Sequence, residues 1–173
     1  MASTHLFAAW IMILLSASAA EAAEVSLSGG GAVGIPTGPG RVTGGPGAAA
    51  DLRFAVDGDG HHCLGALLRG YLVGFDSSSG FPPDTGAFNV AVSYRWVLGD
   101  DGVRPFLSAA AGVGAWLPCI YGDMCGGGGP IVSSGIGVRY GHLEVLAEAL
   151  VQTGMGNGVG ELLVPTFWAG GAF

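Results

Sequence analysis

The sequence contains no lysine: its six basic residues are all arginines, against 13 acidic residues, and the net charge is −7. This deficit disfavours a nucleic-acid partner, because contacts to phosphates need a surplus of cations. Charged residues make up only 11% of the chain, whereas 50% of its residues are hydrophobic. General disorder is not expected either, because disordered chains combine low hydrophobicity with high charge.

Long hydrophobic runs are almost absent. The one exception extends from Leu6 to Leu15 and is shorter than the roughly 20 residues that a membrane-spanning helix needs. Small residues follow it, and Ala20-Glu21-Ala22 has the A-x-A pattern of a signal-peptide cleavage site, although no Lys or Arg precedes the run. We therefore predict that residues 1–22 are a signal peptide, that the protein is exported, and that residues 23–173 form one domain.

Cysteine is scarce, with Cys63, Cys119 and Cys125 all beyond the predicted cleavage site. In an exported protein, the close pair in CIYGDMC favours a disulfide, Cys119–Cys125, that closes a small loop. A metal site at this pair is the alternative, and it is disfavoured because no histidine or third thiol lies nearby in the sequence. Cys63 is then left unpaired, and the sequence predicts neither a metal nor a cofactor.

Helical periodicity is also hard to find, and period-two alternation recurs instead between clusters of Gly, Pro, Asp and Ser. The segments between the predicted strands are alternately long and short. In an up-and-down antiparallel sheet, all the long ones then lie at one end and three tight turns, GDGHH, GDDG and GH, at the other. Barrels of the bacterial outer membrane sort their connections in this way. We predict eight strands: Val25–Ile35, Ala49–Asp57, Cys63–Gly74, Phe88–Leu98, Val103–Ala115, Ile131–Tyr140, Leu143–Val151 and Val164–Phe173.

Charged residues of the predicted strands lie opposite the more apolar face. A soluble sheet would place them in water, but their nearly balanced signs and the apolar opposite face favour a barrel with apolar residues toward lipid. We therefore predict an all-β, eight-stranded antiparallel up-and-down transmembrane barrel whose enclosed charges neutralise one another. The predicted interior network comprises Asp51, Arg53, Asp57, Arg69, Arg95, Arg104, Arg139, Glu144 and Glu148.

Aromatic and small residues fit the same arrangement. Outward-facing aromatic residues near the tight turns predict a girdle at the membrane interface, made by Tyr94, Trp96, Tyr140 and Phe173. Glycines on the inward face suit the narrow interior of eight strands. These glycines are Gly30, Gly34, Gly112, Gly114, Gly135 and Gly137.

In its export signal, strand count, alternating connections and final TFWAGGAF, the sequence resembles the small eight-stranded outer-membrane barrels of the OmpA/OmpX-like superfamily. The resemblance covers nearly all of residues 23–173. It implies a monomer in the bacterial outer membrane, in contact with lipid and lipopolysaccharide. It also implies that Phe173 and Phe167 form a recognition signal for the barrel-assembly machinery, although Gly171 and Ala169 depart from the residues usual between them.

Function is expected in the long connections, as surface interaction, because side chains fill an eight-stranded interior and leave no open pore. An enzyme is not expected. Resemblance to the lipid A-modifying barrels would imply a histidine with a serine or carboxylate near the outer leaflet, whereas His61, His62 and His142 fall in the tight turns. The alternative class is a soluble, exported, lipocalin-like barrel that binds a ligand. It requires the reverse orientation, with an apolar interior and a polar exterior.

Overall fold

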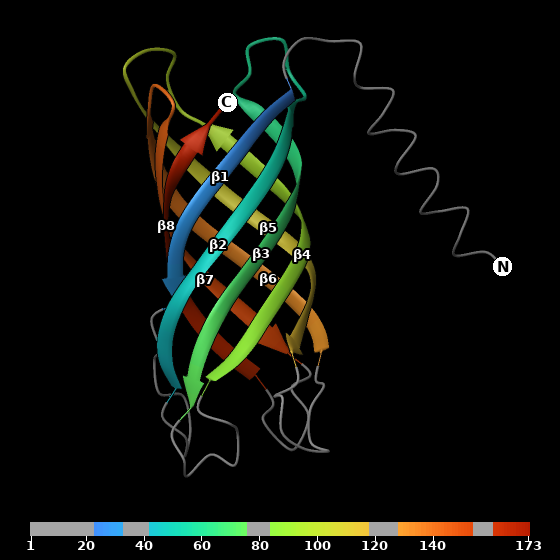
Figure 1. Cartoon of the computed structure of the whole chain (residues 1–173). Coiled ribbons are helices and arrows are strands. Elements are labelled where there is room, and N and C mark those ends of the chain that lie inside the picture. Colours follow the sequence, from blue (N-terminus) through green and yellow to red (C-terminus); the bar gives the residue numbers. More distant parts are fainter. Residues whose placement is uncertain (1–22, 33–41, 76–83, 118–127, 154–160) are drawn as a thin grey trace, which may run out of the picture.

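The computed structural model describes residues 23–32, 42–75, 84–117, 128–153 and 161–173. Each strand pairs antiparallel with the next, and β8 pairs with β1, so the sheet closes into a barrel (Figure 1). The predicted fold class is confirmed. The strands are β1 (Ala23–Ala32), β2 (Val42–Ala55), β3 (His62–Phe75), β4 (Asp84–Val97), β5 (Val103–Leu117), β6 (Gly128–Tyr140), β7 (Leu143–Thr153) and β8 (Glu161–Ala172).

Among the residues that the structure describes, no helix is long and apolar enough to cross a membrane.

Three tight turns, residues 56–61, 98–102 and 141–142, gather at one end of the barrel, which we call the turn end (Figure 1). Glycine makes these turns possible, because Gly60, Gly99, Gly102 and Gly141 have positive φ angles from 57° to 85°. The C-terminus lies at the same end, where Phe173 and Val25 exchange backbone hydrogen bonds of 2.8 and 2.9 Å. The opposite end, at which the strands flanking residues 33–41, 76–83, 118–127 and 154–160 stop, is called the loop end.

The strands that begin at the loop end start earlier than predicted, and in β2 and β6 the added residues include both glycine and proline, which the sequence pattern assigned to loops. Pairing with neighbouring strands holds these residues in the sheet all the same. Pro46 lies where the register of β2 shifts between Gly44 and Gly47, and a missing N–H costs little at such a bulge. Part of each predicted long loop therefore belongs to the barrel wall, from Val42, Asp84, Gly128 and Glu161 onward.

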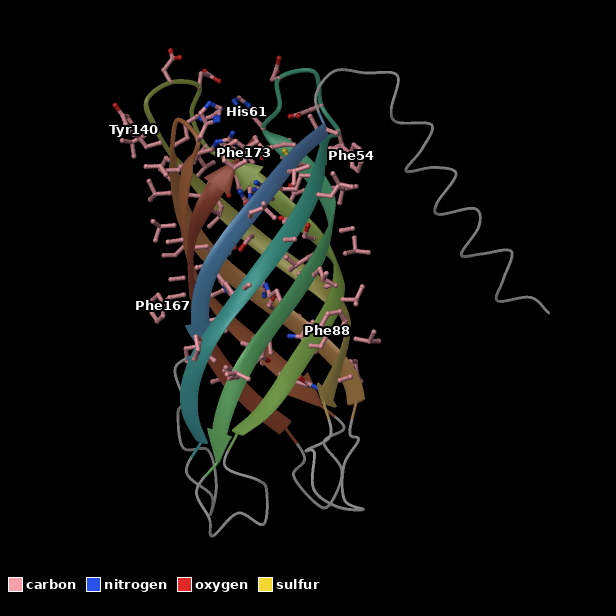
Figure 2. All side chains as sticks on the ribbon, in the orientation of Figure 1. Phe54, His61, Phe88, Tyr140, Phe167 and Phe173 are labelled. Atoms are coloured by element: carbon pink, nitrogen blue, oxygen red, sulfur yellow. The ribbon has the colours of Figure 1, made fainter. Side chains whose placement is uncertain are left out.

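The outer face of the barrel is apolar. On β4, Val90, Val92 and Trp96 are exposed, while the intervening Ser93 and Arg95 are buried, and the other strands alternate in the same way. Tyr140 and Phe167 project outward from the wall (Figure 2). A soluble protein rarely exposes an apolar patch of more than a few hundred Å², so a continuous apolar wall of this kind fits hydrocarbon.

The interior, or lumen, is narrow and filled by side chains. Small inward residues give the large ones room: a side chain on Gly137 would collide with the ring of Phe106, and one on Gly114 would press on Asn89 and Gln152. The interior charges described below therefore lie in a packed tube rather than in an open channel.

Candidate functional site: the charged lumen

Six charged side chains from five strands meet in the lumen near the turn end, and we call them the turn-end cluster. The register of the sheet brings several of them together, because Glu24 on β1 lies directly opposite Arg53 on β2, and Arg139 on β6 lies opposite Glu144 on β7. Opposite charges at such cross-strand positions stabilise the pairing of their strands. The cluster consists of Glu24, Asp51, Arg53, Arg95, Arg139 and Glu144.

Glu144 is the centre of the turn-end cluster. Its Oε1 lies 2.5 Å from Nη1 of Arg95 and 3.7 Å from Nη1 of Arg139, and its Oε2 lies 3.2 Å from Nη2 of Arg53. The hydroxyl of Ser26 also donates a hydrogen bond to Oε2, at 3.3 Å. One carboxylate thus links β7 to β1, β2, β4 and β6 across the lumen.

The other two carboxylates of the cluster complete its charge pairing. Glu24 contacts Arg53 at 2.8 Å and also pairs with Arg139. Asp51 accepts a 2.8 Å hydrogen bond from the Ser93 hydroxyl, and its Oδ2 lies 3.6 Å from Nε of Arg53. Arg53 is only 1% exposed, so its charge depends on these partners rather than on water.

A second ion pair, Arg69–Glu148, lies deeper in the lumen, with 2.6 Å between Nη1 and Oε2. Trp168 covers it, since the guanidinium carbon of Arg69 lies 5.3 Å from the centre of the Trp168 ring. Thr166 connects Trp168 to Glu148, because its hydroxyl accepts a 2.9 Å hydrogen bond from Nε1 of Trp168 and donates one of 3.4 Å to Glu148. Such cation–π contacts gain strength where water is excluded.

The charges of the lumen balance. Four carboxylates and four guanidinium groups form all the pairs described above, so the buried groups neutralise one another without a bound ion. Burying an unpaired charge would cost several kcal/mol, about 3–5 when one partner is removed. The arrangement can therefore hold the strands together and fill the lumen.

Two predicted members of the network lie elsewhere. Asp57 lies in a turn, because β2 ends at Ala55, and its Oδ1 accepts a 3.1 Å hydrogen bond from the backbone N–H of His62. Desolvation raises its pKa, but this hydrogen bond and the nearby His62 and His61 together lower it more, so the pKa lies below its ordinary value of 3.8. Arg104, near the turn end of β5, makes no ion pair within the described part of the chain.

The three histidines of residues 23–173 lie at the turn end. His61 Nε2 is 2.7 Å from Asp100, His62 Nδ1 is 2.6 Å from the Tyr94 hydroxyl, and His142 Nδ1 is 2.8 Å from the backbone oxygen of Ala172. In the described ranges no serine, threonine or cysteine side chain hydrogen-bonds to any of them, so none of these hydroxyls or thiols is paired with a histidine there.

The predicted aromatic residues face outward. Tyr94, Trp96, Tyr140 and Phe173 are exposed toward the turn end, and His62 stacks on Trp96, with ring centres 6.0 Å apart and planes 8° apart. Phe167 lies further from the turn end, on the same outward face of β8 (Figure 2).

Of the three cysteines, the structure describes only Cys63. Cys119 and Cys125, with their predicted disulfide, lie outside the described residues, as does Gly34. Cys63 is a free, half-buried thiol whose Sγ lies 3.7 Å from the Gly60 oxygen.

Glu24, Phe106 and Trp168 are among the interior residues that were not predicted from the sequence. Glu24 fell just outside the predicted first strand, although it shares the inward parity of Ser26, which would have identified it. Phe106 and Trp168 are 1% and 3% exposed in the lumen, where the sequence reading expected polar or small residues. Their places depend on contacts with Arg95 and Arg69, since the Arg95 guanidinium lies 4.0 Å from the centre of the Phe106 ring.

No protein-family model and no curated protein matches the chain in sequence. Among solved structures, the N-terminal β-barrel domain of Pseudomonas aeruginosa OprF is 14% identical with a TM-score of 0.54, over 87% of this chain and 97% of that one. Neisserial surface protein A is 13% identical with a TM-score of 0.54, over 88% and 97%. The outer-membrane enzyme PagL is 14% identical with a TM-score of 0.50, over 87% and 99%.

At this level of identity the likeness concerns the fold. The chain has the fold of the small eight-stranded outer-membrane barrels, as the sequence predicts. Its apolar exterior and charged interior follow the pattern of that class.

Proposed function

We propose that the protein is an integral outer-membrane barrel without an open pore, which acts as a rigid support for surface interaction through residues 33–41, 76–83, 118–127 and 154–160. The observation that carries this proposal is Glu144, which contacts three arginines from three different strands across the lumen near the turn end. A lumen closed by paired charges supports anchoring and presentation rather than transport of solutes.

Residues 1–22 have the proposed role of a signal peptide, and the aromatic residues near the turn end that of an interfacial girdle. Phe173 and Phe167 are proposed to direct assembly of the barrel, and lipid and lipopolysaccharide to surround a monomer. The apolar exterior supports the lipid surroundings, because it needs a hydrocarbon environment. It argues against the soluble, lipocalin-like alternative, which needs an apolar lumen in place of the paired charges.

A lipid-modifying enzyme is a weaker candidate, although PagL shares the fold. The three histidines support the non-enzymatic proposal, because they lie at the turn end, opposite the end proposed to face the outside. In the described part of the chain their ring nitrogens contact the Asp100 carboxylate, the Tyr94 hydroxyl and a backbone oxygen, but no serine, threonine or cysteine.

Cell fractionation and loop mapping test the proposal. We expect the chain to pellet with outer membranes, to need detergent, and to migrate faster on gels before boiling than after it. Protease added to whole cells should cut within residues 33–41, 76–83, 118–127 or 154–160, whereas sites at 56–61 and 98–102 should stay protected. A soluble chain, or cleavage confined to the turns, would overturn the proposal. Swelling of liposomes containing the protein in a sugar solution would overturn the closed lumen.

A further inference from the structure

Two small cavities lie in the lumen, beside the two groups of ion pairs. One has a volume of about 30 Å³ and is lined by residues that include Ser26, Glu144 and Trp168. The other has a volume of about 20 Å³ and is lined by residues that include Ser108 and Glu148. Both are also lined by Asp51, Arg69 and Arg95, so these three side chains lie between the two cavities.

Buried polar atoms surround the smaller cavity. Nε of Arg69, Oε1 of Glu148 and Oγ of Ser108 are all shielded from solvent and find no hydrogen-bond partner among the described protein groups. Each belongs to a residue that lines the smaller cavity. A buried polar atom without a partner costs about 1–3 kcal/mol, so three together near one cavity require an explanation.

Water has the size and the chemistry that this cavity requires. A cavity needs about 10–15 Å³ to accept one water, and a buried water commonly makes about three hydrogen bonds. Arg69 offers a donor, Glu148 an acceptor and Ser108 a hydroxyl that can act as either. One water can therefore satisfy all three groups at once.

The lining also indicates that the occupant is neutral. Each cavity is lined by two carboxylates and two guanidinium groups, with Asp51, Arg69 and Arg95 common to both, Glu144 in one and Glu148 in the other. A cation or an anion in either cavity would disturb this balance and meet a like charge within the same wall.

We propose that the lumen holds a specific water-binding site, formed by Arg69, Glu148 and Ser108, and that water in the two cavities links the turn-end cluster to the Arg69–Glu148 pair. No direct ion pair joins these two groups within the described residues, so water is their connection. The site makes the two groups one hydrogen-bonded unit and supplies a partner for three buried polar atoms that otherwise have none.

Replacing the serine hydroxyl distinguishes a hydrated from a dry cavity by the sign of the effect. In Ser108→Ala, the bound water loses one of three partners, and we expect the thermal midpoint in detergent to fall by about 2–4 °C. In a dry cavity the same change removes an unsatisfied hydroxyl, so the midpoint would stay constant or rise. Ser134→Ala is the matched control, because Ser134 is exposed on the outer face of β6. An effect of equal size in the control would overturn the inference.

A crystal structure of the protein, grown with bromide and rubidium in place of chloride and sodium, tests the occupant directly. We expect water density within hydrogen-bond distance of Arg69, Glu148 and Ser108, and no anomalous peak in either cavity. An anomalous peak would show an ion site instead of a water site. An empty cavity, or a direct bond from Ser108 to Glu148, would also overturn the inference. All of these readouts are independent of any surface activity.

Discussion

The half of the lumen near the turn end and the half near the loop end are filled by different kinds of side chain. The half near the turn end is filled by charges that require one another, with Glu144 at their centre. The half near the loop end is filled by uncharged side chains, apolar ones such as Ile131, Leu150 and Val164, each no more than 2% exposed, together with buried amides and hydroxyls. The first half depends on charge balance and the second on shape. A single substitution should therefore act through electrostatics in one half and through lost volume in the other.

The largest effect is expected from Glu144→Gln, which keeps the shape of the side chain and removes its charge. Arg53, Arg95 and Arg139 then lose their shared carboxylate, and the free energy of unfolding should fall by about 5 kcal/mol. Urea unfolding of the purified protein in detergent measures the change. Asp100→Asn is the control, because the Asp100 side chain is 81% exposed. If Glu144→Gln were as stable as the parent, charge balance would not be what stabilises this half.

The Arg69–Glu148 pair tests whether charge itself or filled volume matters between the two halves. Arg69→Met leaves Glu148 buried without its partner, and we expect a loss of about 3 kcal/mol. Adding Glu148→Leu removes the second charge and should restore most of the stability, because apolar residues of similar volume can replace a buried ion pair. A double-mutant cycle on thermal unfolding in detergent gives the coupling. If the losses of the two single variants simply added up in the double variant, Arg69 and Glu148 would not interact directly. Surface binding should survive in Arg69→Met, in Glu148→Leu and in the double variant.

In the half near the loop end, Leu150→Ala should cost about 2–3 kcal/mol, because it leaves a cavity in a fully enclosed layer. Leu143→Ala on the same strand is the control, since Leu143 is 67% exposed. Chemical unfolding of both variants compares them directly. Equal losses at the two positions would mean that the loop-end half is not tightly packed.

The smallest effect is expected outside both halves, from Asp57→Asn in the turn. The folded protein holds the pKa of Asp57 below its ordinary value of 3.8, so the contribution of this carboxylate is complete above that value. It is lost as the pH falls through the lowered pKa. The parent should therefore melt slightly above the variant at pH 6, and the gap should close toward pH 3. A gap that widens on acidification would contradict the assigned hydrogen bond to His62.

The barrel could be predicted from the sequence because its signals are local. Alternation along Phe88–Leu98 gave the orientation of β4, and the turn residues around Gly99 and Gly141 gave the turn end. The starts of β2 and β6 could not be predicted, since Gly- and Pro-rich segments become strand only when a neighbour pairs with them. Which carboxylate is central also escaped prediction, because parity places Glu144 inside but only register and the chain closure bring three arginines to it.

The seam between β1 and β8 has a consequence for the order in which the structure is acquired. Every other pairing joins strands that follow one another along the chain, whereas the seam joins Ser26 to Ala172. Contacts between distant residues carry the greatest closure entropy, so we expect the seam to form last and to open first. Glu144 on β7 accepts a hydrogen bond from Ser26 on β1 across this seam, so we expect this carboxylate to slow the opening of the barrel.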